Sequence, residues 1–234
     1  ATIFLPVVSP YAALITRMLP DRGPALTRHL DRSLLNIPSV AVEAADRAQH
    51  EIAALVLGES RGVLMQNTLT KPSREMLVTS QAAITETINF LGKVRNIVDD
   101  DYVYRRRLAL LHAGDHLERL IQTIQSVEAP VYGKEVQEAA AKLSTCLEKT
   151  QTWLQGEKRK SKKMVRSLAE TSTGIAEKRR SYRAWLLAEA AAGRMQPDEA
   201  QRRLESMFWL DRLGYHTWRA MHHLAGPSRL GYRS

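Results

Sequence analysis

The stretch LERLIQT, Leu117 to Thr123, is partly repeated as LDRLGYH, Leu210 to His216. Both copies place an acidic residue and then an arginine directly after a leucine, and both lie in long segments rich in Leu, Arg and His. The spacing is constant, because 211 − 118 = 93 for the acidic residue and 212 − 119 = 93 for the arginine. A phrase that recurs at a fixed spacing predicts a repeated structural unit.

Apolar residues around both copies recur at steps of three and four, which is the spacing of one face of an α-helix. No segment shows the alternation of a β-strand bounded by turn residues. The periodicity predicts six long helices, which run from Pro38 to between Gly62 and Asn67, from Lys71 to about Asp99, from about Tyr102 to Ala129, from about Lys134 to Leu154, from the basic run at Lys158 to about Ala192, and from Gln196 onward.

The six predicted helices form two triplets, with a short connection around Pro130 to Gly133. Connections this brief join antiparallel neighbours. The sequence therefore predicts an all-α fold, a duplicated antiparallel three-helix bundle with repeats at residues 38–130 and 131–234. The composition agrees, because aromatic residues make up only 6% of the chain and leave little for a large sheet.

Residues 1–37 stand apart from this helical pattern. The opening ATIFLPVVSPYAALITRMLP has no charge before Arg17 and contains three prolines. It is too short to cross a membrane alone, because a spanning helix needs ~20 apolar residues, and no basic leader precedes it as in a secretory signal. Two interpretations remain, a buried amphipathic arm and the end of a longer membrane span, and we favour the second.

The chain carries 34 Lys and Arg residues against 25 Asp and Glu, a formal net charge of +9. A positive charge of this size favours an anionic partner, but its sign cannot choose among nucleic acid, acidic lipid and an acidic protein. The single cysteine, Cys146, excludes an internal disulfide framework and fits a reducing compartment.

The densest charge lies in a basic run of Lys158, Arg159, Lys160, Lys162 and Lys163. A solvated helix start is the simplest interpretation of such a run. Phosphate or nucleotide binding, nucleic-acid contact and attraction to anionic lipid compete with it. Zinc-finger and RRM signatures are missing from the sequence. Of the three ligands we favour membrane headgroups, because the apolar N-terminal segment already indicates a nearby bilayer, where each surface Lys or Arg contributes ~1 kcal/mol.

Histidines gather on the third and the sixth predicted helices. His112 and His116 are four residues apart and share one side of their helix with Asp115 and Arg119, so that they could approach a common ion. The sixth helix holds a second group, His216, His222 and His223, flanked by Trp209 and Trp218. We interpret both groups as polar, solvated faces, because two histidines without a clear third ligand make a weak metal site.

Signatures of catalysis are missing as well. The sequence contains no GxxxxGK[ST], HExxH or GxGxxG motif, and we identify no nucleophile elbow in it. Cys146 lies in the middle of a predicted helix, in LSTCLEKT, without the electropositive helix N-terminus that activates a nucleophilic thiol. We therefore expect a protein that is not an enzyme and has no cofactor.

The phrases LHAGDHLERL, Leu111 to Leu120, and FWLDRLGYHTWR, Phe208 to Arg219, resemble the repeated LERIGD phrase of PhoU-family helical bundles. The plan of six helices in two repeats agrees with that family. Upstream, LTRHLDRSLLNIPSVAVEAADRAQHEIAALV looks like the junction after the last membrane span of bacterial sodium/phosphate cotransporters that carry a C-terminal PhoU-like domain. The resemblance covers essentially the whole chain, with residues 1–37 as the end of a span and the junction.

In PhoU proteins the phrase carries an acidic residue and, four positions later, an aspartate, which together help to hold a surface metal cluster. Here Glu118 is followed four positions later by Gln122, and Asp211 by Tyr215. An amide or a phenol is a poorer ligand than a carboxylate for a hard cation. We therefore expect no tightly held metal at either copy, unless the paired histidines meet further ligands from a neighbouring helix. We expect the acidic residues to form surface ion pairs with the arginines that follow them.

The resemblance implies a non-catalytic regulatory domain of a sodium-dependent phosphate transporter, at the cytoplasmic face of the bacterial inner membrane. Its partners would be the membrane part of the transporter, anionic lipid headgroups or another protein. A change in the phosphate supply would shift the equilibrium between different ways in which its helix faces dock on these partners. The alternative is a free-standing PhoU-like adaptor that binds a kinase or a transporter, and hydrophobic spans encoded before Ala1 would argue against it. A third interpretation, a basic nucleic-acid-associated bundle, requires a steep salt dependence of binding; we expect no nucleic acid.

Overall fold

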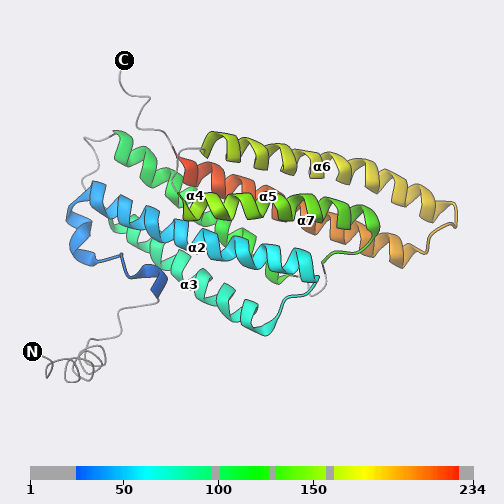
Figure 1. Ribbon diagram of the computed structural model, residues 1–234, viewed down its shortest axis with the longest axis horizontal. Coiled ribbons are helices and arrows are strands. Elements are labelled where there is room, and N and C mark those ends of the chain that lie inside the picture. The colour runs from blue at the N-terminus through cyan, green and yellow to red at the C-terminus, as the bar shows by residue number, and fades with distance from the viewer. Residues whose placement is uncertain (1–24, 96–100, 127–129, 157–160, 227–234) are drawn as a thin grey trace, which may run out of the picture.

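Six long helices account for most of the described chain (Figure 1). The computed structural model describes residues 25–95, 101–126, 130–156 and 161–226. Within these ranges there is no strand, so the prediction of an all-α fold with six long helices is confirmed. The elements are η1 (Ala25–Thr27) and η2 (Arg32–Asn36), which are short 3-10 helices, and α2 (Pro38–Gln66), α3 (Lys71–Lys93), α4 (Asp101–Gln125), α5 (Lys134–Gln155), α6 (Ser161–Ala191) and α7 (Pro197–Ala225).

Local sequence explains where several helices begin and end. Proline occupies the first turn of α2, α3 and α7, where its missing N–H group costs no hydrogen bond. Thr70 caps α3, because its Oγ1 accepts a hydrogen bond from the Ser73 N–H at 3.3 Å. Asn67 ends α2 in the left-handed conformation, with a φ of 53°. These boundaries are the ones that the sequence predicted.

The second predicted helix, by contrast, ends earlier than expected. α3 stops at Lys93 rather than near Asp99, and Val94 has extended backbone angles. Arg107 of α4 explains this end, because its Nε donates a hydrogen bond to the Leu91 carbonyl at 2.8 Å. A side chain from the neighbouring helix thus satisfies a carbonyl group that a further turn of α3 would have bonded.

The helices lie along the long axis of the molecule (Figure 1). α4 packs against α7, where Trp209 Nε1 donates to the Thr123 carbonyl at 2.7 Å. α2 packs against α5, where Arg61 pairs with Glu148 at 2.9 Å. α3 covers α2 and α4, whereas α6 packs on α7 and α5. The triplet α2–α4 therefore meets the triplet α5–α7 mainly through these two helix pairs.

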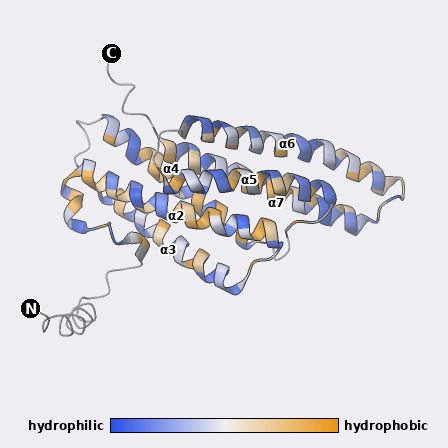
Figure 2. Cartoon of the chain, in the orientation of Figure 1, coloured by the Kyte–Doolittle hydropathy of each residue, from blue (hydrophilic) through white to orange (hydrophobic). Residues whose placement is uncertain are grey.

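A continuous apolar core receives side chains from all six helices. Figure 2 shows that each helix carries both hydrophobic and hydrophilic residues along its length, as expected for helices with one buried face. α6 is the least embedded, since its apolar contribution is the narrow seam of Leu168, Ile175, Tyr182 and Leu186. Its remaining surface is largely free to face solvent or a partner.

The buried faces of α4 and α7 match at a spacing of 100 residues. In this register Arg106, Leu110, Ala113, Gly114, Leu117, Leu120, Ile121 and Ile124 align with Ser206, Leu210, Leu213, Gly214, Thr217, Ala220, Met221 and Leu224, and every one of these residues is buried. At the spacing of 93 seen in the repeated phrase, six of the eight residues again align with buried residues, whereas Arg106 and Leu110 align with Glu199 and Arg203, which are only partly buried. The two spacings differ by seven residues, about two helical turns, so both align the same buried faces of α4 and α7, and a spacing of 100 matches them at two more positions.

The junction before the first long helix docks on the bundle. η1 and η2 contact α2 and α3, and Leu26, Leu30, Leu34 and Leu35 pack partly against the core. The apolar opening, residues 1–24, lies outside the described residues. Among the helices that are described, none combines the length and the hydrophobicity needed to cross a membrane.

Candidate functional site

Glu118 and Asp211, the acidic residues of the repeated phrase, each face the covering helix of their own triplet. Thr85 of α3 donates to Glu118 Oε1 at 3.2 Å, and Arg179 of α6 pairs with Asp211 Oδ2 at 3.1 Å. Burial raises the pKa of Asp211, and the positive charge of Arg179 opposes this rise. The expected pairing of Asp211 with the arginine that follows it is thus wrong, because successive residues of a helix do not face each other.

The basic run falls only partly within the described residues. Lys158, Arg159 and Lys160 lie outside them, whereas Lys162 and Lys163 are exposed in the first turn of α6. Cations at this end of a helix oppose its dipole. Helix stability therefore gives no reason for these lysines, and an anionic partner would supply one.

Four imidazole rings line the seam between α4 and α7, and we call them the histidine row. His112 and His116 come from α4, and His216 and His223 come from α7. Ring centroids are 5.1 Å apart between His112 and His223, and 5.8 Å apart between His223 and His116. They are 5.6 Å apart between His116 and His216, whose Nδ1 atoms approach to 3.3 Å. The structure thus brings together the two histidine groups that the sequence keeps apart.

The environment of the histidine row favours uncharged rings at neutral pH. Burial, and to a smaller extent the neighbouring His116, lowers the pKa of His216 to about 4. Burial also lowers the pKa of His223 to about 4, with Arg219 as the next largest cause. The pKa of His116 is likewise lowered by burial, although Asp115 acts in the opposite direction. Three of the four rings therefore keep free lone pairs near pH 7.

The row does not form a complete metal cage. Within the described part of the chain, no three His, Cys, Asp or Glu side chains are grouped so as to hold one metal ion. The rings of His223 and His116 are nearly parallel, with 9° between their planes and 5.8 Å between their centroids. The nearby carboxylate of Asp115 is engaged by Arg119, whose Nε lies 3.0 Å from Oδ2.

A second polar cluster lies inside the bundle next to the end of the histidine row. Arg106 of α4 donates from Nη2 to Asp46 Oδ1 at 2.6 Å and to the Leu224 carbonyl at 2.7 Å, and from Nη1 to the His223 carbonyl at 3.0 Å. His50 Nδ1 lies 2.8 Å from Asp46 Oδ1. The cluster satisfies the last carbonyl groups of α7 and joins α2, α4 and α7.

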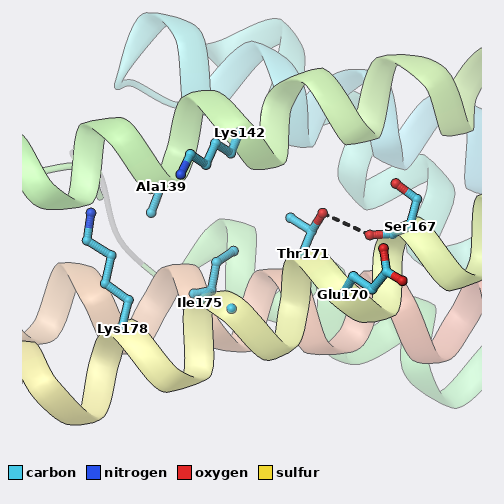
Figure 3. A pocket seen from close by; sticks show the side chains of 8 residues that line it. Ala139, Lys142, Ser167, Glu170, Thr171, Ile175 and Lys178 are labelled. Carbon is cyan, nitrogen blue, oxygen red and sulfur yellow. Dashed lines mark hydrogen bonds between the residues drawn. The ribbon is translucent and has the colours of Figure 1, made fainter.

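A groove of about 380 Å³ lies between α5 and α6 (Figure 3). Lys142 and Lys178 extend toward it from opposite helices. Lys178 Nζ already pairs with Glu138 at 3.3 Å, and the Thr171 hydroxyl donates to the Ser167 carbonyl at 2.9 Å. Most of its polar groups thus bond within the protein, which makes the groove a weaker candidate than the histidine row.

The first long helix contains a motif that is typical of hydrolases. GESRG, residues 58–62, has the spacing GxSxG of a hydrolase nucleophile elbow. It lies inside α2 rather than at a turn between a strand and a helix, and Ser60 is fully buried. The Ser60 hydroxyl donates to the Val56 carbonyl of its own helix at 2.7 Å. This serine is therefore not placed as a nucleophile.

A second motif could have located the histidine row from the sequence. The pattern GxHxxR occurs at Gly114, His116 and Arg119 and again, 100 residues later, at Gly214, His216 and Arg219. This spacing is the register in which α4 and α7 bury equivalent positions.

No family model, no curated protein and no solved structure matches the chain.

Proposed function

We propose that the chain is a non-catalytic, PhoU-like regulatory domain of a sodium-dependent phosphate transporter, built from a duplicated three-helix unit. One observation carries the proposal: the two phrases that resemble the PhoU repeat lie on α4 and α7, and these helices pack against each other where the two triplets meet. This pairing supports the proposal of a duplicated three-helix unit.

In this proposal the domain acts at the cytoplasmic face of the bacterial inner membrane, through contacts with the membrane part of its own transporter. α6 is the helix best placed to make them, because it contributes only a narrow seam to the core. It exposes Lys162 and Lys163 at its start, and Trp185 and Leu187 near its end are 42% and 56% exposed. A basic start beside a bilayer would also meet anionic headgroups.

Phosphate uptake by the complete gene product tests the proposal. Cells that lack other phosphate transporters would express the complete reading frame, or the same frame without the bundle, residues 38–226. We expect both to take up phosphate in a sodium-dependent way, and only the complete protein to change its uptake rate between phosphate-rich and phosphate-poor growth. Equal responses of the two would overturn the proposal.

The alternative, a free-standing PhoU-like adaptor, makes a different prediction in the same cells. A reading frame that begins near Ala1 would transport nothing, and purification of the chain would retain a kinase or a transporter as a separate polypeptide. The two proposals therefore differ in whether cells that express the gene for this chain gain sodium-dependent phosphate uptake.

A further inference from the structure

His116 and His216 bring two ring nitrogens together from different triplets. Their Nδ1 atoms are 3.3 Å apart. Two imidazole nitrogens that bind one tetrahedral zinc ion at ~2.05 Å lie about 3.3 Å apart. In the structure the two nitrogens share a hydrogen bond, in which one ring donates and the other accepts. An ion bound between them would replace this hydrogen bond at nearly the same separation.

The protonation state of the two rings is suitable for metal binding. Imidazole binds a metal through the lone pair of its neutral form. A hydrogen bond between two Nδ1 atoms needs an unprotonated nitrogen as its acceptor, so at least one of the two rings presents a lone pair. The two rings come from separate helices, which distinguishes the pair from a chance neighbour along one helix.

The surroundings predict a weak site rather than a tight one. Asp115 is the carboxylate that raises the pKa of His116, but Arg119 holds it, and Arg219 adds a further positive charge near the row. The ring centroid of His223 lies 5.8 Å from that of His116, and no third His, Cys, Asp or Glu among the described residues completes a metal-binding group here. Two protein ligands would leave the other coordination positions to water.

We propose that His116 and His216 form a labile site for a borderline divalent transition metal, Zn²⁺, Ni²⁺ or Cu²⁺, across the seam between α4 and α7. Imidazole suits these ions and does not suit Mg²⁺ or Ca²⁺. A bound ion ties one triplet to the other. The site is separate from Glu118 and Asp211, and it does not rest on the proposed function.

Thermal unfolding of the chelator-treated full chain tests the site. We expect the melting temperature to be unchanged by the chelator itself, and to rise by about 5–10 °C when Zn²⁺ or Ni²⁺ is added at 100 times its Kd. Titration calorimetry at neutral pH should give one ion per chain. The changes His116→Gln and His216→Gln should each weaken binding about tenfold or more.

Matched variants make the test specific. His29→Gln removes a histidine outside the row, and Glu118→Ala and Asp211→Ala remove the acidic residues of the repeated phrase; all three should bind like the unchanged protein. Mg²⁺ should leave the melting temperature unchanged. The proposal is overturned if none of the three transition metals binds at 1 mM or below, or if His116→Gln and His216→Gln bind as well as His29→Gln.

A spectroscopic measurement keeps the test independent of how the variants fold. Cu²⁺ bound to the unchanged chain should show electron paramagnetic resonance splitting from two equatorial nitrogen ligands. A spectrum without nitrogen splitting would place the ion on carboxylates or water and remove the histidine site from consideration.

Discussion

Arg106 of α4 and Asp46 of α2 form an ion pair inside the bundle, with 2.6 Å between Nη2 and Oδ1. Their side chains are only 8% and 14% exposed. The same arginine donates to the His223 and Leu224 carbonyls at the end of α7. One side chain thus couples three helices from both triplets, and the carboxylate of Asp46 balances its charge.

Removing that carboxylate should destabilise the fold strongly. Asp46→Asn leaves the buried guanidinium of Arg106 without its counter-charge, and we expect a loss of about 3 kcal/mol in the free energy of unfolding. Urea unfolding followed by circular dichroism measures it. Glu43→Gln is the matched control on the same helix, because Glu43 pairs with Arg47 in solvent and should cost less than about 1 kcal/mol. Equal effects of the two changes would contradict the assigned role.

The same pair predicts how stability depends on pH. Burial would raise the pKa of Asp46, but the hydrogen bond with His50 and the charge of Arg106 outweigh it and hold the pKa well below its ordinary value. A carboxylate of this kind contributes stability that is present above its unfolded pKa, about 3.9, and is lost as the pH falls below that value.

We therefore expect the stability difference between the unchanged protein and Asp46→Asn to be largest above about pH 5 and to shrink toward pH 3. Urea titrations across this range check it. A difference that stays constant with pH would show that the Asp46 charge is not responsible.

Gly226 should resist substitution. It follows α7 with a φ of 58°, and a Cβ atom there would collide with the Arg106 guanidinium. We expect Gly226→Ala to cost about 1–2 kcal/mol. Gly62 is the control, because it lies inside α2 with open space around it. Gly62→Ala should therefore raise the free energy of unfolding by about 0.5–1 kcal/mol. Thermal melting of both variants would show whether they shift in opposite directions.

The basic run should bind anionic membranes by electrostatic attraction, which salt weakens. We expect the chain to float with vesicles of phosphatidylglycerol and phosphatidylcholine at low salt and to be released at high salt. Replacing Lys158, Arg159, Lys160, Lys162 and Lys163 by Gln should abolish flotation, whereas replacing the exposed Lys93, Lys142 and Lys149 should preserve most of it. Unchanged flotation of the first variant would exclude the basic run as the lipid contact.

Residues 1–20 should be dispensable for folding. Every later apolar stripe has a partner helix to cover it, so we expect the shortened chain to be soluble, with the helical circular dichroism spectrum and melting temperature of the full chain. Aggregation confined to the shortened chain would mean that the apolar opening covers part of the bundle.

Helix number, helix type and most boundaries follow from local sequence. Apolar steps of three and four in segments such as Ala113 to Ile124 specify one buried face, and residues such as Thr70 and Pro72 mark a start within one turn. These signals act between residues close in the chain, so they can be read without knowing the neighbours. The end of α3 could not, because Arg107 from α4 sets it.

The histidine row and the Arg106 cluster depend instead on how helices pack. His116 and His216 are 100 residues apart, and they meet because α4 and α7 pack in opposite directions, so that Thr123 meets Trp209 and His112 meets His223 on either side of them. Asp46 and Arg106 look like ordinary helix-surface charges in the sequence, and the packing of α7 against both of their helices makes them a buried pair. Periodicity selects the face of a helix that is buried, but the register between two such faces is chosen by side-chain packing along their whole length.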